Sequence, residues 1–510
     1  MIINALRKLD DIANDFERRH DWPPRGLKGL DMSENTCLLR RKVLLAGAGI
    51  GAAALSLPRL SRAADVGAAE VSVPLPDTST LGVLVWNVER VGYESAEYFL
   101  TGRANVYKPV SMADAPDVAS RDNSKDLGTR EFSRELISAQ QPFTTRLIVY
   151  RPKNKRHFSG NVIVETLHPN GGGSSLAWNA VHHFFVANGD AYVGVQHPLT
   201  FGGVKAADPT RYAGLNAVDP TQLWGMLAQT GAAIKIQGRS SPLYGYAVRH
   251  LLMTGYSYTG VATATFANYH HQQARLENGR NIFDGYLPMA DAQYVRPLDV
   301  PVMRLNTQSD FNGFGGLNNR RPDDDRYRHY EIAGAAHVAV HAPDGDLVPP
   351  APGKVPTPAG QPHFSQSTCQ DMFPAGSRPN DYPLYVVQAA MFDNMYRWMN
   401  KQQLPPASAM IETNADGSCR IDEHGNAMGG VRYPQVSVPV AVYGVGATAA
   451  CILFGYTAPF DADKCRTLYG SQANYLSKVK SSAETLVAGR LLLRSDPDKL
   501  LAIAGQGAAF

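Results

Sequence analysis

The sequence has few charged residues and no long apolar run. Charged residues make up 19% of its 510 residues, and the formal net charge is +3. No basic stripe is present, so nucleic acid is not expected as a partner. The moderately apolar run at residues 46–57 is too short and too rich in Gly and Ala to form a stable membrane span.

Cysteine is scarce, with five residues in the whole chain. One, Cys37, lies near the N-terminus, and the other four are Cys369, Cys419, Cys451 and Cys465. None of them has C-x-x-C spacing, so a zinc site is not expected. An even number in an exported protein predicts two disulfides, with three pairings open. The simplest local pair is Cys451 with Cys465, which leaves Cys369 for Cys419.

Residues 1–64 are predicted to be a targeting segment. Arg40 and Arg41 form a twin-arginine pair ahead of the apolar run, and residues 61–65 supply a cleavage site. This order is typical of folded export in a bacterium and predicts a periplasmic or secreted protein. The alternative is a basic cytosolic loop.

The rest of the chain predicts an α/β fold. With 44% hydrophobic residues it can bury a large core. Strand-like runs alternate with helical patterns, which favours a mostly parallel central sheet with helices on both faces. Strands are predicted within 81–110 and at 143–152, 161–166, 191–196, 250–254, 284–289, 300–306 and 327–332. Helices are predicted at 176–188, 259–273, 384–400 and 472–492.

Three regions of the exported chain are distinguished. Residues 65–404 are predicted to form the main domain, and residues 405–510 a C-terminal extension packed on it. Residues 199–241 lack a strand signal but lie between two strands, so they are predicted to be a lid insertion over the site. The alternative is that their apolar residues form an ordinary core helix.

The segment GYSYTG at residues 255–260 predicts a nucleophile elbow. An apolar strand enters the turn, Ser257 stands at its apex, and a helix of small residues follows. Such a turn lifts a serine hydroxyl clear of the sheet, where a base can take its proton. The usual pattern is G-x-S-x-G, and here Thr259 holds the second glycine position, with Gly260 one residue later.

An acid and a histidine follow the serine in the chain order that the elbow predicts. Asp310 comes after the strand at 300–306, and His337 follows the strand at 327–332 through a turn of small residues. We therefore predict Ser257 as nucleophile, His337 as general base and then acid, and Asp310 as the group that orients it. Asp291, one strand earlier, is the alternative acid.

A glycine-rich loop after the strand at 161–166 predicts an oxyanion hole. The loop reads HPNGGGSS from His168, and glycines leave backbone N–H groups free to turn inward. The predicted donors are the backbone N–H of Tyr258 and those of Asn170, Gly171 and Gly172. A phosphate-binding loop is disfavoured because a Lys-Ser/Thr ending is missing.

Three aromatic or imidazole side chains are predicted to contact the substrate. They are His168, Trp178 and Tyr256, each within or beside the predicted site. The alternative is that these rings belong to the core, where large aromatic side chains are common.

Together these motifs resemble a family of secreted "alpha/beta hydrolase domain-containing" proteins. The resemblance rests on VIVETLHPNGGG, GYSYTG, EIAGAAH, and the C-terminal blocks at 429–444, 454–460 and 468–476. It covers about residues 81–496 and implies an α/β-hydrolase fold with esterase-type activity.

These features predict a serine hydrolase that cleaves a carboxylic ester through an acyl-enzyme, without a metal or organic cofactor. A small-molecule or polymeric ester is its expected substrate. The same three residues also suit an amide, a lactone or a polyester, because selectivity depends on the pocket. A non-catalytic binding protein on the same fold is the alternative from another class.

Overall fold

The computed structural model describes most of the chain after the N-terminal segment. The described residues are 66, 69–76, 88–108, 134–169, 173–291, 293–313, 316–339, 369, 372–446, 448, 451–507 and 510. Residues 64–510 group into one compact unit. The predicted targeting segment at 1–64 lies outside the described residues, so twin-arginine export stays a prediction. None of the described helices combines the length and apolar character needed to cross a bilayer.

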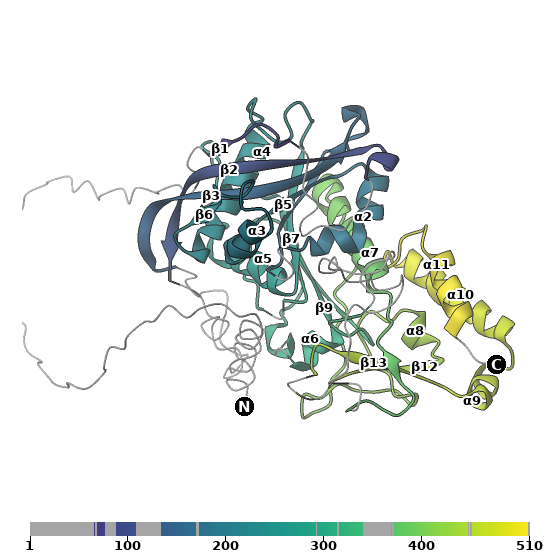
Figure 1. Ribbon diagram of the computed structural model, residues 1–510. Coiled ribbons are helices and arrows are strands. Elements are labelled where there is room, and N and C mark those ends of the chain that lie inside the picture. The colour runs from purple at the N-terminus through teal and green to yellow at the C-terminus, as the bar shows by residue number, and fades with distance from the viewer. Residues whose placement is uncertain are drawn as a thin grey trace, which may run out of the picture. The chain divides into compact units, whose positions relative to one another are not determined.

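A large twisted sheet forms the centre of this unit (Figure 1). Its order is β1-β2-β3-β5-β4-β7-β8-β9-β10, and β6 pairs with β3. The strands from β5 through β10 in this order run parallel, whereas β1, β2 and β3 pair antiparallel. The bounds are β1 Glu70–Val71, β2 Tyr93–Tyr107, β3 Leu136–Pro152, β4 Asn161–Thr166, β5 Ala191–Val195, β6 Asn216–Ala217, β7 His250–Tyr256, β8 Gly285–Met289, β9 Val302–Thr307 and β10 Tyr327–Ile332.

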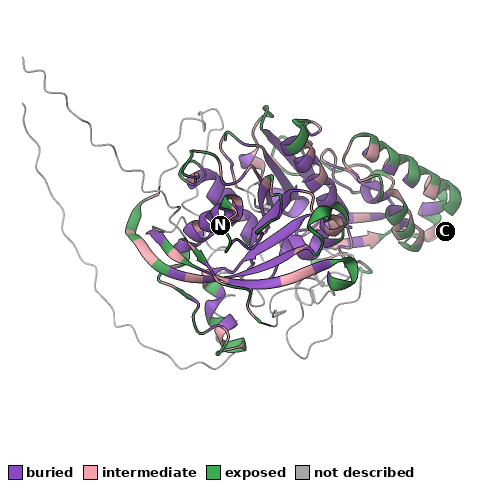
Figure 2. Cartoon of the chain, turned by 90° about the horizontal axis from the view of Figure 1, so that it is seen from above, coloured by how far each residue is buried: buried purple, intermediate pink, exposed green. Residues whose placement is uncertain are grey.

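Helices cover both faces of the sheet, as the sequence predicted. On one face α2 and α7 pack with residues of β4, β7, β8 and β9 in one hydrophobic cluster. On the other, α4 and α5 pack in a second cluster, and the central strands between the two layers are buried (Figure 2). The bounds in this part are α2 Leu176–Asn188, α3 Phe201–Ala207, α4 Leu223–Ile236, α5 Tyr258–Tyr269, α6 Gln308–Gly313 and α7 Leu384–Lys401.

The predicted lid at 199–241 does not hold for its second half. Ten of the fourteen residues of α4 are buried. A Cβ added to Gly225 would lie 2.4 Å from Ala104 Cβ, and one added to Gly231 would lie 2.4 Å from Ile282 Cγ2. These glycines let α4 pack closely in the core, so α4 is a core helix. The segment before it contains α3 and β6 and stays only a predicted lid.

The C-terminal region continues the core and carries a small second sheet. β11 Arg378–Pro379, β13 Gly455–Pro459 and β12 Ala441–Val445 pair antiparallel. Single parallel bridges join Tyr330 to Ala409 and Ile332 to Val431 along the edge strand β10. The region therefore covers an edge that would otherwise expose unpaired backbone groups.

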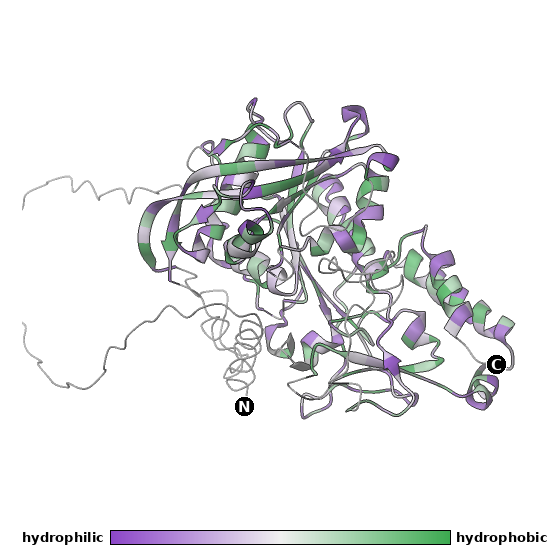
Figure 3. Cartoon of the chain, viewed as in Figure 1, coloured by the Kyte–Doolittle hydropathy of each residue, from purple (hydrophilic) through white to green (hydrophobic). Residues whose placement is uncertain are grey.

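The helices of this region pack through one face. In α10 Gln472–Ala488 the buried residues are Tyr475, Val479, Ala483 and Leu486, a spacing of three to four residues that places them on one side. Hydrophilic and hydrophobic residues mix along α10 and α11 (Figure 3). The other helices are α8 Pro434–Ser437, α9 Ala462–Tyr469 and α11 Pro497–Gly507.

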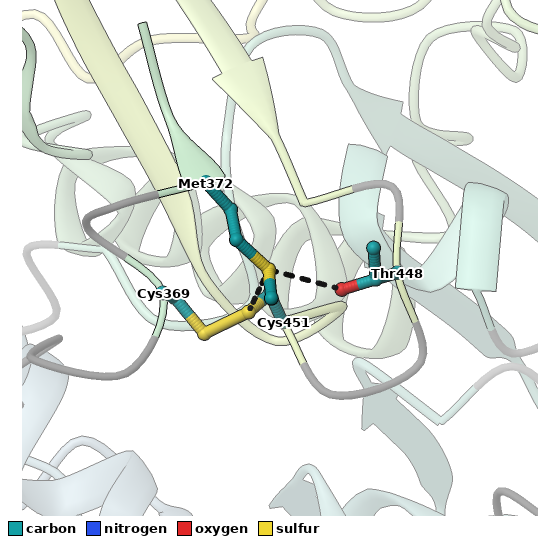
Figure 4. Close-up of a disulfide and its surroundings, with 4 residues drawn as sticks. All are labelled: Cys369, Met372, Thr448 and Cys451. Carbon is teal, nitrogen blue, oxygen red and sulfur yellow. Dashed lines mark hydrogen bonds between the residues drawn. A yellow bond between two sulfur atoms is a disulfide. The ribbon is translucent and has the colours of Figure 1, made fainter. Parts of the chain in front are cut away.

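A disulfide joins Cys369 to Cys451, so the simplest predicted pairing, Cys451 with Cys465 and Cys369 with Cys419, was wrong (Figure 4). Their Cα atoms are 5.7 Å apart, and Met372 Sδ lies 3.5 Å from Cys451 Sγ. Cys419 and Cys465 are free. The local pair fails because the five-residue strand β13 separates Cys451 from Cys465, and an extended strand carries the chain away by about 3.4 Å per residue.

Candidate active site

Ser257 stands at a sharp turn between β7 and α5. Its backbone has φ 59° and ψ −127°, a conformation that a residue with a Cβ adopts only under strain. The flanking glycines make the turn possible. A Cβ on Gly255 would lie 2.2 Å from the backbone oxygen of Thr259, and one on Gly260 would lie 2.1 Å from that of Met289.

Thr259, the departure from the usual pattern, ties the turn together. Its Oγ1 accepts a hydrogen bond from the backbone N–H of Tyr256 at 2.9 Å and donates one to the Tyr256 carbonyl, also at 2.9 Å. The side chain is fully buried. The sequence showed Thr259 as a missing glycine and gave no sign of this clamp, because both bonds exist only once the turn has formed.

The turn after β10 brings His337 to Ser257. His337 Nε2 lies 2.9 Å from Ser257 Oγ, and its Nδ1 lies 2.7 Å from Asp310 Oδ1. Gly334 adopts φ +84° in this turn, and a Cβ there would lie 2.5 Å from Val436 Cγ1. The backbone oxygen of His337 accepts a bond from Tyr256 Oη at 2.8 Å. Serine, imidazole and carboxylate thus form one continuous hydrogen-bonded chain.

The two candidate acids have different partners. Asp310 is fully buried, and its second oxygen accepts bonds from Thr307 N at 2.7 Å and Thr307 Oγ1 at 2.8 Å. These bonds aim the first oxygen at His337. Asp291 instead accepts a bond from Arg304 at 2.8 Å, and both side chains of this ion pair are fully buried. The geometry therefore favours Asp310 over Asp291 as partner of the imidazole.

The predicted oxyanion loop is closed by a backbone bridge. His168 N donates to Ser174 O at 2.7 Å, and Ser174 N donates to His168 O at 2.9 Å. Asn170, Gly171 and Gly172 lie outside the described residues, so their role stays a prediction. Tyr258 is the first residue of α5, where a backbone N–H has no partner within the helix and the helix dipole favours negative charge.

Residues 67–502 match a family model described as "Alpha/beta hydrolase domain". The chain belongs to this family. The match continues past residue 405 to residue 502, so the family domain includes most of the predicted C-terminal extension. The observed sheet and the family agree with the fold class expected from the sequence.

The other comparisons do not identify the substrate of this alpha/beta hydrolase. No curated protein matches the chain. Similar solved structures include esterase Est22 (9% identity, TM-score 0.22, 32% of this chain and 59% of that one). Others are esterase B from Lactobacillus rhamnosis (15%, 0.22, 34% and 62%) and methylesterase BT1017 (10%, 0.23, 52% and 52%). At such identities and TM-scores these similarities say nothing about the substrate.

Two of the predicted substrate contacts of this hydrolase are core residues. Trp178 is fully buried and stacks on Tyr150 with ring centroids 4.3 Å apart. Tyr256 is 3% exposed, and its hydroxyl supports the His337 turn. Neither has surface to offer a ligand. Both rings therefore pack in the core, which was the alternative to a contact with substrate.

His168 is the third predicted contact, and it lies beside the serine turn. Its ring is edge-on to that of Tyr258, with centroids 6.1 Å apart. Burial, with the nearby charges of His337 and His197, lowers the pKa of His168 to about 3. The ring is therefore neutral at pH 7.

The sequence did not point to Glu165, on β4. Its carboxyl group is fully buried and accepts a bond from the Ala177 N–H at 2.9 Å and one from Tyr192 Oη at 2.7 Å. It therefore serves the N-terminus of α2, where Ser175 makes no side-chain cap bond. Burial raises the pKa of Glu165 to about 8 despite these bonds. The sequence feature that could have pointed to Glu165 is a glutamate inside the apolar run VIVET, where a charged residue is unusual.

The sequence did not point to Gln196 either, which lies against Gly173, the last glycine of the predicted oxyanion loop. Arg146 donates to Gln196 Oε1 at 3.0 Å, and Arg146 also forms a fully buried ion pair with Glu97. A Cβ on Gly173 would lie 2.2 Å from Gln196 Nε2. Gly173 therefore packs against a side chain that the buried ion pair holds in place.

Proposed function

We propose that the protein is a serine hydrolase that cleaves a carboxylic ester. The observation that carries the proposal is the hydrogen-bonded chain Ser257 Oγ, His337 Nε2 and Nδ1, Asp310 Oδ1, with distances of 2.9 and 2.7 Å. A base within about 3 Å of a hydroxyl is the arrangement that nucleophilic catalysis requires. Membership of a hydrolase family agrees with it.

In the proposed mechanism Ser257 attacks the ester carbonyl while His337 takes its proton. Asp310 keeps Nδ1 protonated and stabilises the imidazolium that forms. The N–H of Tyr258 and the loop at Asn170, Gly171 and Gly172 hold the oxyanion. His337 then gives the proton to the leaving alcohol, and a water molecule activated by the same imidazole releases the acid from the acyl-enzyme.

The proposed location is the periplasm or the medium. The twin-arginine pair at Arg40 and Arg41 supports it, and a disulfide is typical of an oxidising compartment. Localising a C-terminally tagged chain with and without Arg40→Lys and Arg41→Lys tests it. We expect export to stop in the double variant, and unchanged export would contradict the proposal.

Hydrolysis of p-nitrophenyl esters over a chain-length series tests the activity, with wild type beside Ser257→Ala. We expect turnover in the wild type and a loss of at least about 10³-fold in the variant. Equal activity in both would refute the assignment of Ser257. If a folded wild type cleaves no ester, the proposal of ester cleavage fails, and amide, lactone and polyester substrates are tested next with the same variant.

A further inference from the structure

His197 shares the serine's edge of the sheet. It follows β5, and His168 follows β4. In the register of these parallel neighbours, Thr166 pairs with Val195, so each histidine lies two residues past that pair. β7, which ends at the Ser257 turn, is the next strand, on the other side of β4. The carboxyl ends of three adjacent parallel strands thus carry His197, His168 and Ser257.

The ring of His197 contacts the residue that follows the serine. It is edge-on to the Tyr258 ring, with centroids 5.5 Å apart and planes at 67°. His168 approaches the same ring at 6.1 Å. Tyr258 itself is 40% exposed, whereas His197 is 3% exposed. Two imidazoles therefore flank an accessible tyrosine ring at the proposed oxyanion donor.

One hydrogen bond assigns the proton of His197. Its Nδ1 accepts a bond from the backbone N–H of Leu199 at 3.1 Å, which caps the short helix Pro198–Thr200. A ring nitrogen that accepts carries no hydrogen, so the neutral ring bears its proton on Nε2. Burial lowers the pKa of His197 to about 4, which keeps the ring neutral at pH 7.

The Nε2–H donor of His197 has no acceptor among the described residues. The atom is also not completely buried. The bond from Leu199 N–H restrains the ring itself, and Gln196, the preceding residue, is held by Arg146 and by Thr200. A restrained N–H donor therefore lies in a ring that contacts Tyr258, the residue after the serine.

We infer that His197 Nε2–H is a substrate-binding donor, and that the preferred substrate carries a second oxygen acceptor close to the scissile ester. Hydroxyl, ether and carboxylate oxygens all have the required chemistry. A purely aliphatic ester would cover this N–H without pairing it, which costs binding energy. The inference rests on the proposed function, because it assumes that Ser257 attacks an ester.

Two pairs of esters test the inference, and each pair replaces one CH₂ by oxygen. On the acyl side the pair is p-nitrophenyl butyrate and p-nitrophenyl methoxyacetate. On the alcohol side it is butyl acetate and 2-methoxyethyl acetate. The measured quantity is the kcat/KM ratio of the oxygenated to the aliphatic ester, and comparing this ratio between variants cancels the intrinsic reactivity of each ester.

Two substitutions of His197 separate the donor from the cap. His197→Asn keeps an acceptor near the position of Nδ1, so the Leu199 cap is preserved, but it removes the distal donor. His197→Gln keeps a distal N–H and weakens the cap. His157→Asn, at an exposed histidine of the helix Lys155–His157, serves as the control. Thermal melts establish that all variants are folded.

We expect the ratio of at least one pair to fall about tenfold in His197→Asn, and to stay within about twofold of wild type in His197→Gln and His157→Asn. Unchanged ratios for both pairs in His197→Asn would overturn the inference. Equal falls in His197→Asn and His197→Gln would also overturn it and would assign a structural role.

The outcomes also separate this inference from the proposed function. If the wild type cleaves the esters, Ser257→Ala does not, and no ratio moves, the inference alone fails. If the folded wild type cleaves none of the four esters and a fluorophosphonate does not label Ser257, both fail together.

Discussion

At the scale of single residues, two buried aspartates near the proposed site differ in their partners, and only one of them contacts His337. Asp310 bonds to Nδ1 of the imidazole, while Asp291 neutralises Arg304. The proposed mechanism therefore gives Asp310 a role in catalysis and leaves Asp291 a role in folding, although both follow buried strands in the sequence.

Asparagine substitutions at the two positions are expected to affect different properties, catalysis for Asp310 and stability for Asp291. Asp310→Asn is expected to lower kcat by about 10⁴-fold because the imidazole loses the acceptor that fixes its tautomer. Asp291→Asn is expected to keep most activity per folded molecule but to destabilise the protein by about 3–5 kcal/mol, because Arg304 loses its buried partner. Steady-state kinetics and urea denaturation measure the two effects. A larger loss of kcat in Asp291→Asn would assign the catalytic acid to Asp291.

The Thr259 clamp predicts a second residue-scale effect. Thr259→Val keeps the shape but removes both hydrogen bonds between Thr259 Oγ1 and the Tyr256 backbone, so the unfolding free energy is expected to fall by about 1–3 kcal/mol. Thr259→Ser retains the hydroxyl and is expected to remain close to wild type. Denaturation of the three proteins in parallel checks this, and equal stability of Thr259→Val and wild type would show that the clamp contributes nothing.

At the scale of elements, the sequence predicted the strands near the site well. β4 and β10 begin and end at the predicted residues, and β7 is longer by two residues than expected. Central strands buried on both faces are continuous apolar runs, which the sequence displays directly. α4 was mistaken for a lid because an apolar helix between strands has the same pattern in either role. Its packing against Ala104 depends on a strand far away in the chain.

The helix α2 offers a pH test, because Glu165 at its N-terminus has a raised pKa of about 8. The folded group holds its proton more tightly than the unfolded one, so its contribution to stability is present below about pH 4.5 and is lost as pH rises through about 8. Glu165→Gln removes this dependence. Its unfolding free energy relative to wild type is expected to rise by about 1 kcal/mol per pH unit within this window.

Denaturation of Glu165→Gln and wild type at pH 5, 6, 7 and 8 measures this difference. Comparing the two proteins cancels the titration of other groups, such as His168 and His197. Their lowered pKa values remove stability in the opposite direction, as pH falls below about 6.5. A difference that does not change with pH would contradict the assigned shift of Glu165.

At the scale of the whole molecule, the C-terminal region supports the proposed active site. Val436 packs against Gly334 in the His337 turn, and Val338 N donates to Leu453 O at 2.8 Å. Leu453 lies two residues from the disulfide cysteine Cys451. The sequence predicted that this region packs on the main domain, but its contacts with the histidine turn join segments that no local pattern connects.

The disulfide predicts both a connectivity and a loss of stability. Peptide mapping without reduction is expected to find Cys369 linked to Cys451, with Cys419 and Cys465 as free thiols. Replacing Cys369 and Cys451 by Ser opens a loop of 82 residues, which is expected to cost about 4 kcal/mol in the chain-entropy account. A link between Cys451 and Cys465 would contradict the structure.

His337 is proposed to activate Ser257 as a nucleophile. Intact-mass kinetics with a fluorophosphonate test it most directly, followed by peptide mapping of the labelled residue. We expect one label per chain, located on Ser257, and a labelling rate at least about 10²-fold lower in His337→Ala. A label on another residue, or equal rates in wild type and His337→Ala, would contradict it.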